Sequence, residues 1–220
     1  MSVKYIYHHL GLGDHIICNS IIRIYSYKYD NIVLFVKEHN LCSVKNMFID
    51  LNNITYITGD DYYINRYCGE HEIDLLKIGF EYTDHRLNFD ESFYNQLNIN
   101  FNERWDLFYI KRNIDSEIKL FNKFNLKPNT YIFVHDDSDR GFNINIENNN
   151  MKIIRPIKGL TENIFDYLYL IENSAEIHCI DSSFRVLIDS INLKNDKIYF
   201  YTKSRPEIQL AKSKLNWIIK

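Results

Sequence analysis

A strand–turn–helix pattern near the start of the chain constrains its fold most strongly. Residues 5–9 are rich in β-branched and aromatic types, Gly11 and Gly13 follow, and apolar residues at helical spacing occupy 16–24. This order predicts a strand, a tight loop and a helix, which is where an α/β protein holds a ligand. Because glycine can take positive φ and has no Cβ, we expect backbone N–H groups at the helix start to face an anionic or polyhydroxylated ligand.

Asp14 follows these glycines at the start of the predicted helix. A carboxylate there caps the helix, which stabilises it by about 0.5–2 kcal/mol, or it acts as a general base. The two roles have similar weight and do not exclude each other. His15 can orient a substrate hydroxyl or cap the helix. His8 and His9 alternate across the end of the strand, so at most one of them faces the ligand.

The first 60 residues continue the alternation of strands and helices. Residues 31–37 form a near-continuous β-branched and aromatic run, typical of a strand covered on both faces and paired parallel to the first. A helix over 43–51, capped by Ser43, and a third strand over 54–58 follow. This β-α-β-α-β order predicts half of a doubly wound sheet.

The pattern is weaker in the middle of the chain. Residues 73–80 fit a strand or a short helix, and residues 90–97 predict a helix. Arg104, Trp105 and the aromatic residues over 93–109 form either a sugar-stacking platform or part of the core. The core is the commoner place for such aromatic side chains, and we favour it.

A second α/β series follows a helix predicted over 117–124. The expected strands are 131–135, 152–155, 176–180, 197–201 and 216–219, and the expected helices are 161–171, with Thr161 as its cap, 184–191 and 207–212. The sequence therefore predicts an α/β fold of two Rossmann-like halves, with domains 1–114 and 115–220. A central cleft between the halves is the expected binding site.

Composition argues against several classes of protein. With 220 residues, 45% of them hydrophobic, the chain can bury a substantial core without disulfides. A net charge of −3 provides no basic field for nucleic acid or an anionic membrane. No apolar run approaches the roughly 18 residues of a spanning helix, and no signal peptide precedes the first strand. Four cysteines without CxxC spacing indicate reduced thiols and a cytoplasmic protein.

The second half repeats the logic of the opening motif at Asp181, Ser182 and Ser183. These residues separate the strand 176–180 from the next helix, so their hydroxyls lie where free N–H groups and the positive end of the helix dipole bind phosphate. Ordinary N-capping is the commoner role for such residues. The functional interpretation gains weight because the first half carries a matching loop.

Three cations accompany this loop. Arg140, Arg155 and Lys158 lie in or near the carboxyl edges of second-half strands, where a diphosphate needs cationic partners. Each alone is more often a solvated surface charge, but together with the serine loop they predict a pyrophosphate clamp.

The paired motifs resemble those of glycosyltransferases of GT-B architecture, especially the heptosyltransferase-like group and short virus- and phage-type sugar transferases. The resemblance rests on two motifs. The first is Gly-Leu-Gly-Asp-His at residues 11–15, followed by Asn19 and Arg23, and the second is Asp-Ser-Ser-Phe at residues 181–184. In heptosyltransferases the Asp of a Gly-Asp pair is the base, and an Asp-Ser-Gly followed by a histidine lies by the donor diphosphate. Asp14 matches that base and Asp181-Ser182 match the donor loop, whereas Ser183 replaces the glycine, and Val186 or Leu187 the histidine.

The resemblance implies a compact GT-B-like glycosyltransferase that moves a sugar from a nucleotide-sugar donor to a glycan or other acceptor hydroxyl. Asp14 would be catalytic, with Gly11, Gly13, His15 and Asn19 in the acceptor-side loop. With the base opposite the leaving phosphate, the simpler mechanism is an inverting displacement. No cofactor or divalent metal is expected, no nucleic acid is an expected partner, and a viral source would place the protein in the host cytoplasm.

The loop after the strand 131–135 permits other interpretations. His135, Asp136 and Asp139 either hold nucleoside or sugar hydroxyls or make a polar turn. Asp137 and Asp139 also have the Asp-x-Asp spacing with which GT-A transferases chelate a metal, but two βαβ halves do not fit a single GT-A sheet. The histidines near the first loop lack the spacing of a zinc site.

Three alternatives remain open from the sequence. A nucleotide-sugar hydrolase or 2-epimerase would keep the fold, and a non-catalytic Rossmann-like binding module would use Asp14 and the serines only as caps. A dinucleotide oxidoreductase is disfavoured because Gly11 and Gly13 lack the third glycine of GxGxxG.

Overall fold

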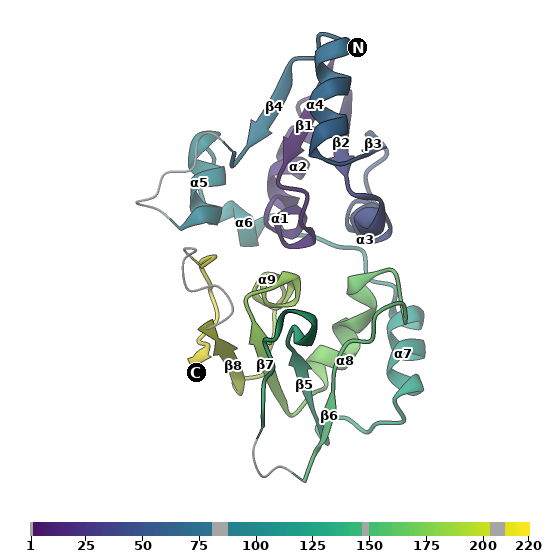
Figure 1. Cartoon of the computed structure of the whole chain (residues 1–220), viewed down its shortest axis with the longest axis vertical. Helices are drawn as coiled ribbons and strands as arrows, with labels where there is room; N and C mark the ends of the chain where they lie inside the picture. Colours follow the sequence, from purple (N-terminus) through teal and green to yellow (C-terminus); the bar gives the residue numbers. More distant parts are fainter. Residues whose placement is uncertain (1, 81–87, 147–149, 203–209) are drawn as a thin grey trace. The chain divides into compact units, whose positions relative to one another are not determined.

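A computed structural model describes residues 2–80, 88–146, 150–202 and 210–220 (Figure 1). These residues form an α/β protein with two parallel sheets, one of four strands and one of five. The chain divides into two compact units: residues 2–111 with 210–212, and residues 112–202 with 213–220, apart from the gaps in the described ranges. The division thus follows residue 111, where the sequence placed it after 114.

The first unit alternates strands and helices along the chain. Its elements are β1 (Val3–His8), α1 (Leu12–Ile17), α2 (Asn19–Ser26), β2 (Asn31–Val36), a 3-10 turn (Glu38–Asn40), α3 (Leu41–Met47), β3 (Ile54–Thr58), α4 (Asp61–Glu70), β4 (Leu75–Ile78), α5 (Phe89–Gln96) and α6 (Glu103–Asp106). The strand order is β3-β2-β1-β4, all parallel. The expected parallel pairing of the first two strands and the third strand at 54–58 are therefore confirmed, and residues 73–80 contain a strand.

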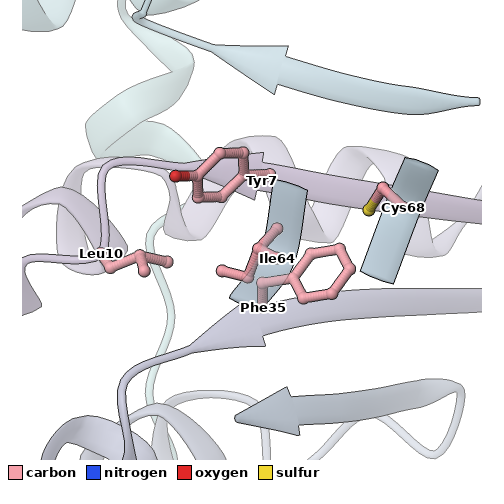
Figure 2. Close-up of a cluster of buried hydrophobic side chains, with 5 residues drawn as sticks. All are labelled: Tyr7, Leu10, Phe35, Ile64 and Cys68. Carbon is pink, nitrogen blue, oxygen red and sulfur yellow. The ribbon is translucent and has the colours of Figure 1, made fainter. Parts of the chain in front are cut away.

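Buried side chains cover the sheet of the first unit on the face toward α4. Tyr7 of β1 and Phe35 of β2 pack with Leu10 and with Ile64 and Cys68 of α4 (Figure 2). Ile64 and Cys68 lie four residues apart, so both project from one side of the helix. Side chains of adjacent strand residues point to opposite faces of the sheet. The helix α4 therefore covers one face only, and side chains on the opposite face must be buried by other elements.

Three local features of the first unit differ from what the sequence suggests. Neither Gly11 nor Gly13 takes positive φ: Gly11 has φ −68° and ψ 145°, and Gly13 lies inside α1. The expected single helix is interrupted at Cys18, which has ψ near 2° and separates α1 from α2. Ser43 lies buried inside α3 rather than capping it, because the preceding 3-10 turn leads directly into that helix.

A buried ion pair joins distant segments of the first unit. The Asp90 carboxylate of α5 pairs with the Arg104 guanidinium of α6, and both side chains are 0% exposed. Asp90 also accepts the Lys212 backbone N–H at 3.0 Å, while Arg104 donates to the Lys212 carbonyl at 2.9 Å. The pair therefore binds the returning chain through the backbone of Lys212.

The second unit forms a five-stranded parallel sheet. Its elements are α7 (Ile114–Lys123), β5 (Tyr131–His135), a 3-10 turn (Ser138–Arg140), β6 (Lys152–Ile154), a 3-10 turn (Ile164–Tyr167), α8 (Leu168–Glu172), β7 (Glu176–Ile180), α9 (Ser183–Ser190), β8 (Ile198–Tyr201) and β9 (Ile218–Ile219). The strand order is β6-β5-β7-β8-β9. The predicted strands 131–135 and 176–180 coincide with β5 and β7.

The helix predicted over 161–171 is shorter and begins differently. Asn163, not Thr161, caps the 3-10 turn by accepting the Phe165 N–H, and α8 supplies only Leu168–Glu172. Thr161 instead hydrogen-bonds to the Asp166 carboxylate at 2.5 Å. Residues 207–209 of the helix predicted over 207–212 lie outside the described ranges, and residues 210–212 are not helical.

All four cysteines are free thiols, as the sequence predicts. Among the described residues, no helix combines the length and apolar character that a membrane crossing requires.

Candidate functional site

Each sheet contains a topological switch point, where the chain changes the side on which it adds strands. In the first unit the chain proceeds from β1 outward to β2 and β3, and then places β4 on the other side of β1. In the second unit β6 and β7 flank β5 in the same way. Connections on the two sides of a switch point diverge, so the carboxyl ends of these strands border a crevice where α/β proteins bind ligands.

Asp14 lies beside the switch point of the first unit. Its strand, β1, ends at His8, and Asp14 occupies the first turn of α1, whose N-cap is Gly11. Asp14 is half-buried and Gly11 is exposed. Because Gly11 is the N-cap, Asp14 does not take the capping role expected for it, but a carboxylate in the first turn still stabilises the helix through its dipole.

His15 is buried rather than directed toward a ligand. Its side chain is 1% exposed and meets the His8 ring edge to face, with ring centroids 4.3 Å apart. Burial lowers the pKa of His8 to about 4 and that of His15 well below its usual 6.5. Both imidazoles are therefore neutral at pH 7, and His15 does not orient a ligand hydroxyl in this conformation.

This histidine pair predicts loss of stability in acid. Between pH 6.5 and about 4 the unfolded chain binds protons that buried His8 and His15 do not, so the free energy of unfolding falls as pH falls. For His8 alone the loss amounts to about 3 kcal/mol below pH 4. Urea denaturation at pH 7.5, 6 and 5 measures it. His15→Phe should flatten this pH dependence, whereas His39→Phe, at an exposed position, should not; equal slopes would contradict the assignment.

Asn19 has a structural role within the first unit. The side chain is fully buried, donates to the Tyr109 carbonyl at 3.1 Å and accepts the Tyr109 N–H at 3.2 Å. Arg23 joins it by donating to the same carbonyl and to the Asp50 carboxylate, at 2.8 Å each. The amide of Asn19 is thus occupied by the backbone, and the acceptor-side role expected for it is not supported.

Aromatic rings pack between the carboxyl ends of β1 and β4, the two strands that border the first switch point. Phe80, just after β4, stacks on Tyr7 and on His9, with centroid distances of 4.6 and 4.2 Å. His9 also lies 3.2 Å from the Gly79 carbonyl, so it joins the ends of β1 and β4, while His8 is buried. Phe93 and Tyr94 are buried, which agrees with core packing at the start of the aromatic segment, whereas Tyr109 at its end is exposed.

The start of α9 forms the switch-point edge of the second unit. Ser182 is the N-cap, and its hydroxyl accepts the Arg185 N–H at 3.4 Å. Ser183 is the first helical residue, and both serines are half-buried. Asp181 is 7% exposed and lies 3.6 Å from the Arg185 guanidinium, so its carboxylate is directed toward the helix.

The three expected cations differ in their surroundings. Arg155 follows β6 and pairs with the Asp136 carboxylate at 3.0 Å, with its own side chain 43% exposed and that of Asp136 7% exposed. Arg140 pairs with Asp137 in the loop after β5. Lys158 is exposed in the loop after β6. Both guanidinium groups are therefore already paired with acidic neighbours in their own loops.

The sequence analysis did not identify Arg185, a buried charged residue in α9. Arg185 is 3% exposed, and its guanidinium lies 3.6 Å from Asp181 and from Asp189 and 4.5 Å above the Phe200 ring. Asp189 is fully buried and also accepts the Trp217 indole N–H at 2.9 Å. The i, i+4, i+8 spacing of these three charges was the available signal.

The acidic loop after β5 is engaged in local structure. Asp136 accepts the Ile144 N–H at 3.0 Å, and Asp137 accepts both the backbone and the side-chain N–H of Arg140. The His135 ring packs at a tilt against Phe184, with ring centroids 4.5 Å apart, and burial lowers the pKa of His135 to about 4. Within the described ranges, no group of three or more His, Cys, Asp or Glu side chains is arranged to hold a metal ion.

Comparison with protein-family models, with curated proteins and with solved structures finds no match to this chain.

Proposed function

We propose that this protein is a GT-B-like glycosyltransferase that transfers a sugar from a nucleotide-sugar donor to an acceptor hydroxyl. One observation carries the proposal: each of the two motifs identified in the sequence follows a strand that borders a switch point. Asp14 follows β1 in the first unit, and Ser182 and Ser183 follow β7 in the second. Two α/β units that each place polar groups at such an edge support a two-substrate enzyme.

In the proposed reaction Asp14 is the general base. Its carboxylate takes the proton of the acceptor hydroxyl while the acceptor oxygen forms a bond to the anomeric carbon of the donor. The bond from that carbon to the diphosphate oxygen breaks, and its electron pair leaves with the nucleoside diphosphate. Attack opposite the leaving group inverts the anomeric centre.

The second unit supplies the proposed donor site. N–H groups at the start of α9, together with the hydroxyls of Ser182 and Ser183, stabilise the negative charge that develops on the leaving diphosphate. Arg155 adds a guanidinium that the largely buried Asp136 carboxylate orients, and Lys158 adds an exposed ammonium group. In this assignment Asp181 positions Arg185 rather than touching the donor. These groups neutralise the diphosphate without a divalent metal.

A panel of UDP, GDP, ADP and CMP, each with and without EDTA, tests this function by thermal shift. At 100 times its Kd a nucleotide stabilises the folded state by about 2.7 kcal/mol, which raises Tm by about 5–10 °C in a chain of this size. We expect one nucleotide to give this shift and EDTA to leave it unchanged. No shift with any of them would contradict the proposal and favour the non-catalytic module.

Arg155 provides a specific test of the donor site. We expect Arg155→Ala to weaken nucleotide binding by about 10-fold or more, because a charge-assisted hydrogen bond to phosphate is lost. Arg155→Lys should retain part of the affinity. Arg66→Ala removes an exposed arginine of α4 and should have no effect. Calorimetric titration measures all three, and wild-type affinity in Arg155→Ala would remove Arg155 from the site.

A further inference from the structure

Gly11 stands at a position where its backbone does not require glycine. Its φ of −68° and ψ of 145° are open to any residue, unlike those of Gly79, whose φ is +85°. As the N-cap of α1, Gly11 also occupies a site where Ser, Thr, Asp or Asn would satisfy the helix N–H groups better. Neither backbone conformation nor capping therefore explains the glycine.

The side chain of Asp14 explains why position 11 is glycine. A Cβ built on Gly11 would lie 2.5 Å from Oδ2 and 3.6 Å from Cγ of Asp14, and 2.5 Å is closer than non-bonded carbon and oxygen atoms approach. The Asp14 carboxylate thus folds back from the first turn of α1 over the Cα of Gly11. It occupies the volume that any other residue at position 11 would fill.

We infer that Gly11 is a positioning residue, whose missing side chain provides the seat for the Asp14 carboxylate. The inference rests on the proposed function of Asp14 as the base. A side chain at position 11 displaces the Asp14 carboxylate from this place.

Two substitutions separate the seat from capping. Gly11→Ala adds a Cβ and lacks a capping oxygen, whereas Gly11→Ser adds the same Cβ and restores a favoured N-cap. If the seat matters, both variants lower kcat by roughly 10- to 100-fold while the KM for the donor stays near its wild-type value, because a displacement of about 1 Å suffices for such a loss. Recovery of kcat in Gly11→Ser would overturn the inference, since capping alone would then account for the loss.

The control is Gly69→Ala in α4, where an added Cβ meets no atom within 4 Å. It should leave kcat unchanged. In an Asp14→Asn background, Gly11→Ala should cause no further loss, because the displaced group is already inactive. A further independent loss in the double variant would count against the seat.

A spectroscopic measurement keeps the inference testable if no transferase activity exists. The carboxyl 13C resonance of Asp14 should move in Gly11→Ala and in Gly11→Ser, and should stay in place in Gly69→Ala. An unmoved resonance in both Gly11 variants would overturn the seat whatever the enzyme does. A moved resonance without activity in the wild type would retain the seat and reject the proposed function.

Discussion

Asp14→Asn is expected to lower kcat by about 10²- to 10⁴-fold, because the amide cannot accept the proton of the acceptor hydroxyl. Binding of the nucleotide should stay within about threefold of wild type, since the proposed donor site lies in the other unit. Asn is close in size to Asp and can still accept hydrogen bonds in the first turn of α1. The change therefore alters the chemistry more than the fold. Steady-state kinetics with calorimetric binding of the nucleotide measures both quantities.

The matched control for Asp14→Asn is Asp115→Asn. Asp115 lies in the first turn of α7 and is exposed, so the substitution removes an equivalent helix-dipole interaction away from either switch point. It should leave kcat unchanged. Full activity in Asp14→Asn would remove the base assignment, and equal losses in the two variants would attribute the effect to helix stability.

Asp90→Asn is expected to have the largest effect on stability, lowering the free energy of unfolding by about 3–5 kcal/mol. The substitution leaves the fully buried Arg104 guanidinium without its carboxylate, and it turns one acceptor of the Lys212 N–H into an amide. Desolvation makes an uncompensated buried charge costly. Urea denaturation of the full chain, followed by circular dichroism, measures the change.

An exposed ion pair provides the comparison. Asp74 pairs with Lys4 at 2.7 Å, but its side chain is 92% exposed, so Asp74→Asn should leave the unfolding midpoint unchanged. Replacing Arg104 by Met in the Asp90→Asn background removes the unpaired charge and should recover part of the lost stability. Equal effects of Asp90→Asn and Asp74→Asn would show that the buried pair does not hold the first unit together.

Short strands bounded by turn residues are the features that the sequence predicts best. The β-branched and aromatic runs at 54–58, 131–135 and 176–180 are bounded by turn residues, and their limits agree with β3, β5 and β7. In contrast, α4 was missed, because its sequence is polar and only Ile64 and Cys68 are buried. A single apolar pair four residues apart is too short a pattern to predict a helix.

The sequence predicts which loops follow the central strands, but not which side chains remain accessible there. His15 and Asn19 lie at the expected helix, yet the packing of His8 buries the first and the Tyr109 backbone engages the second. Asp90 accepts a hydrogen bond from the backbone N–H of Lys212, which is 122 residues away in the sequence. Contacts between segments so far apart arise from tertiary packing and have no local signature in the sequence.

The most direct test of the proposed function is titration of the 15N-labelled protein with UDP, GDP, ADP and CMP, observed through backbone amide resonances. We predict that one nucleotide shifts the amides of residues 182–185 at the start of α9 together with that of Arg155, and leaves those of α7 unchanged. Shifts confined to other regions, or no shifts with any nucleotide, would contradict the assignment of the second unit as the donor site.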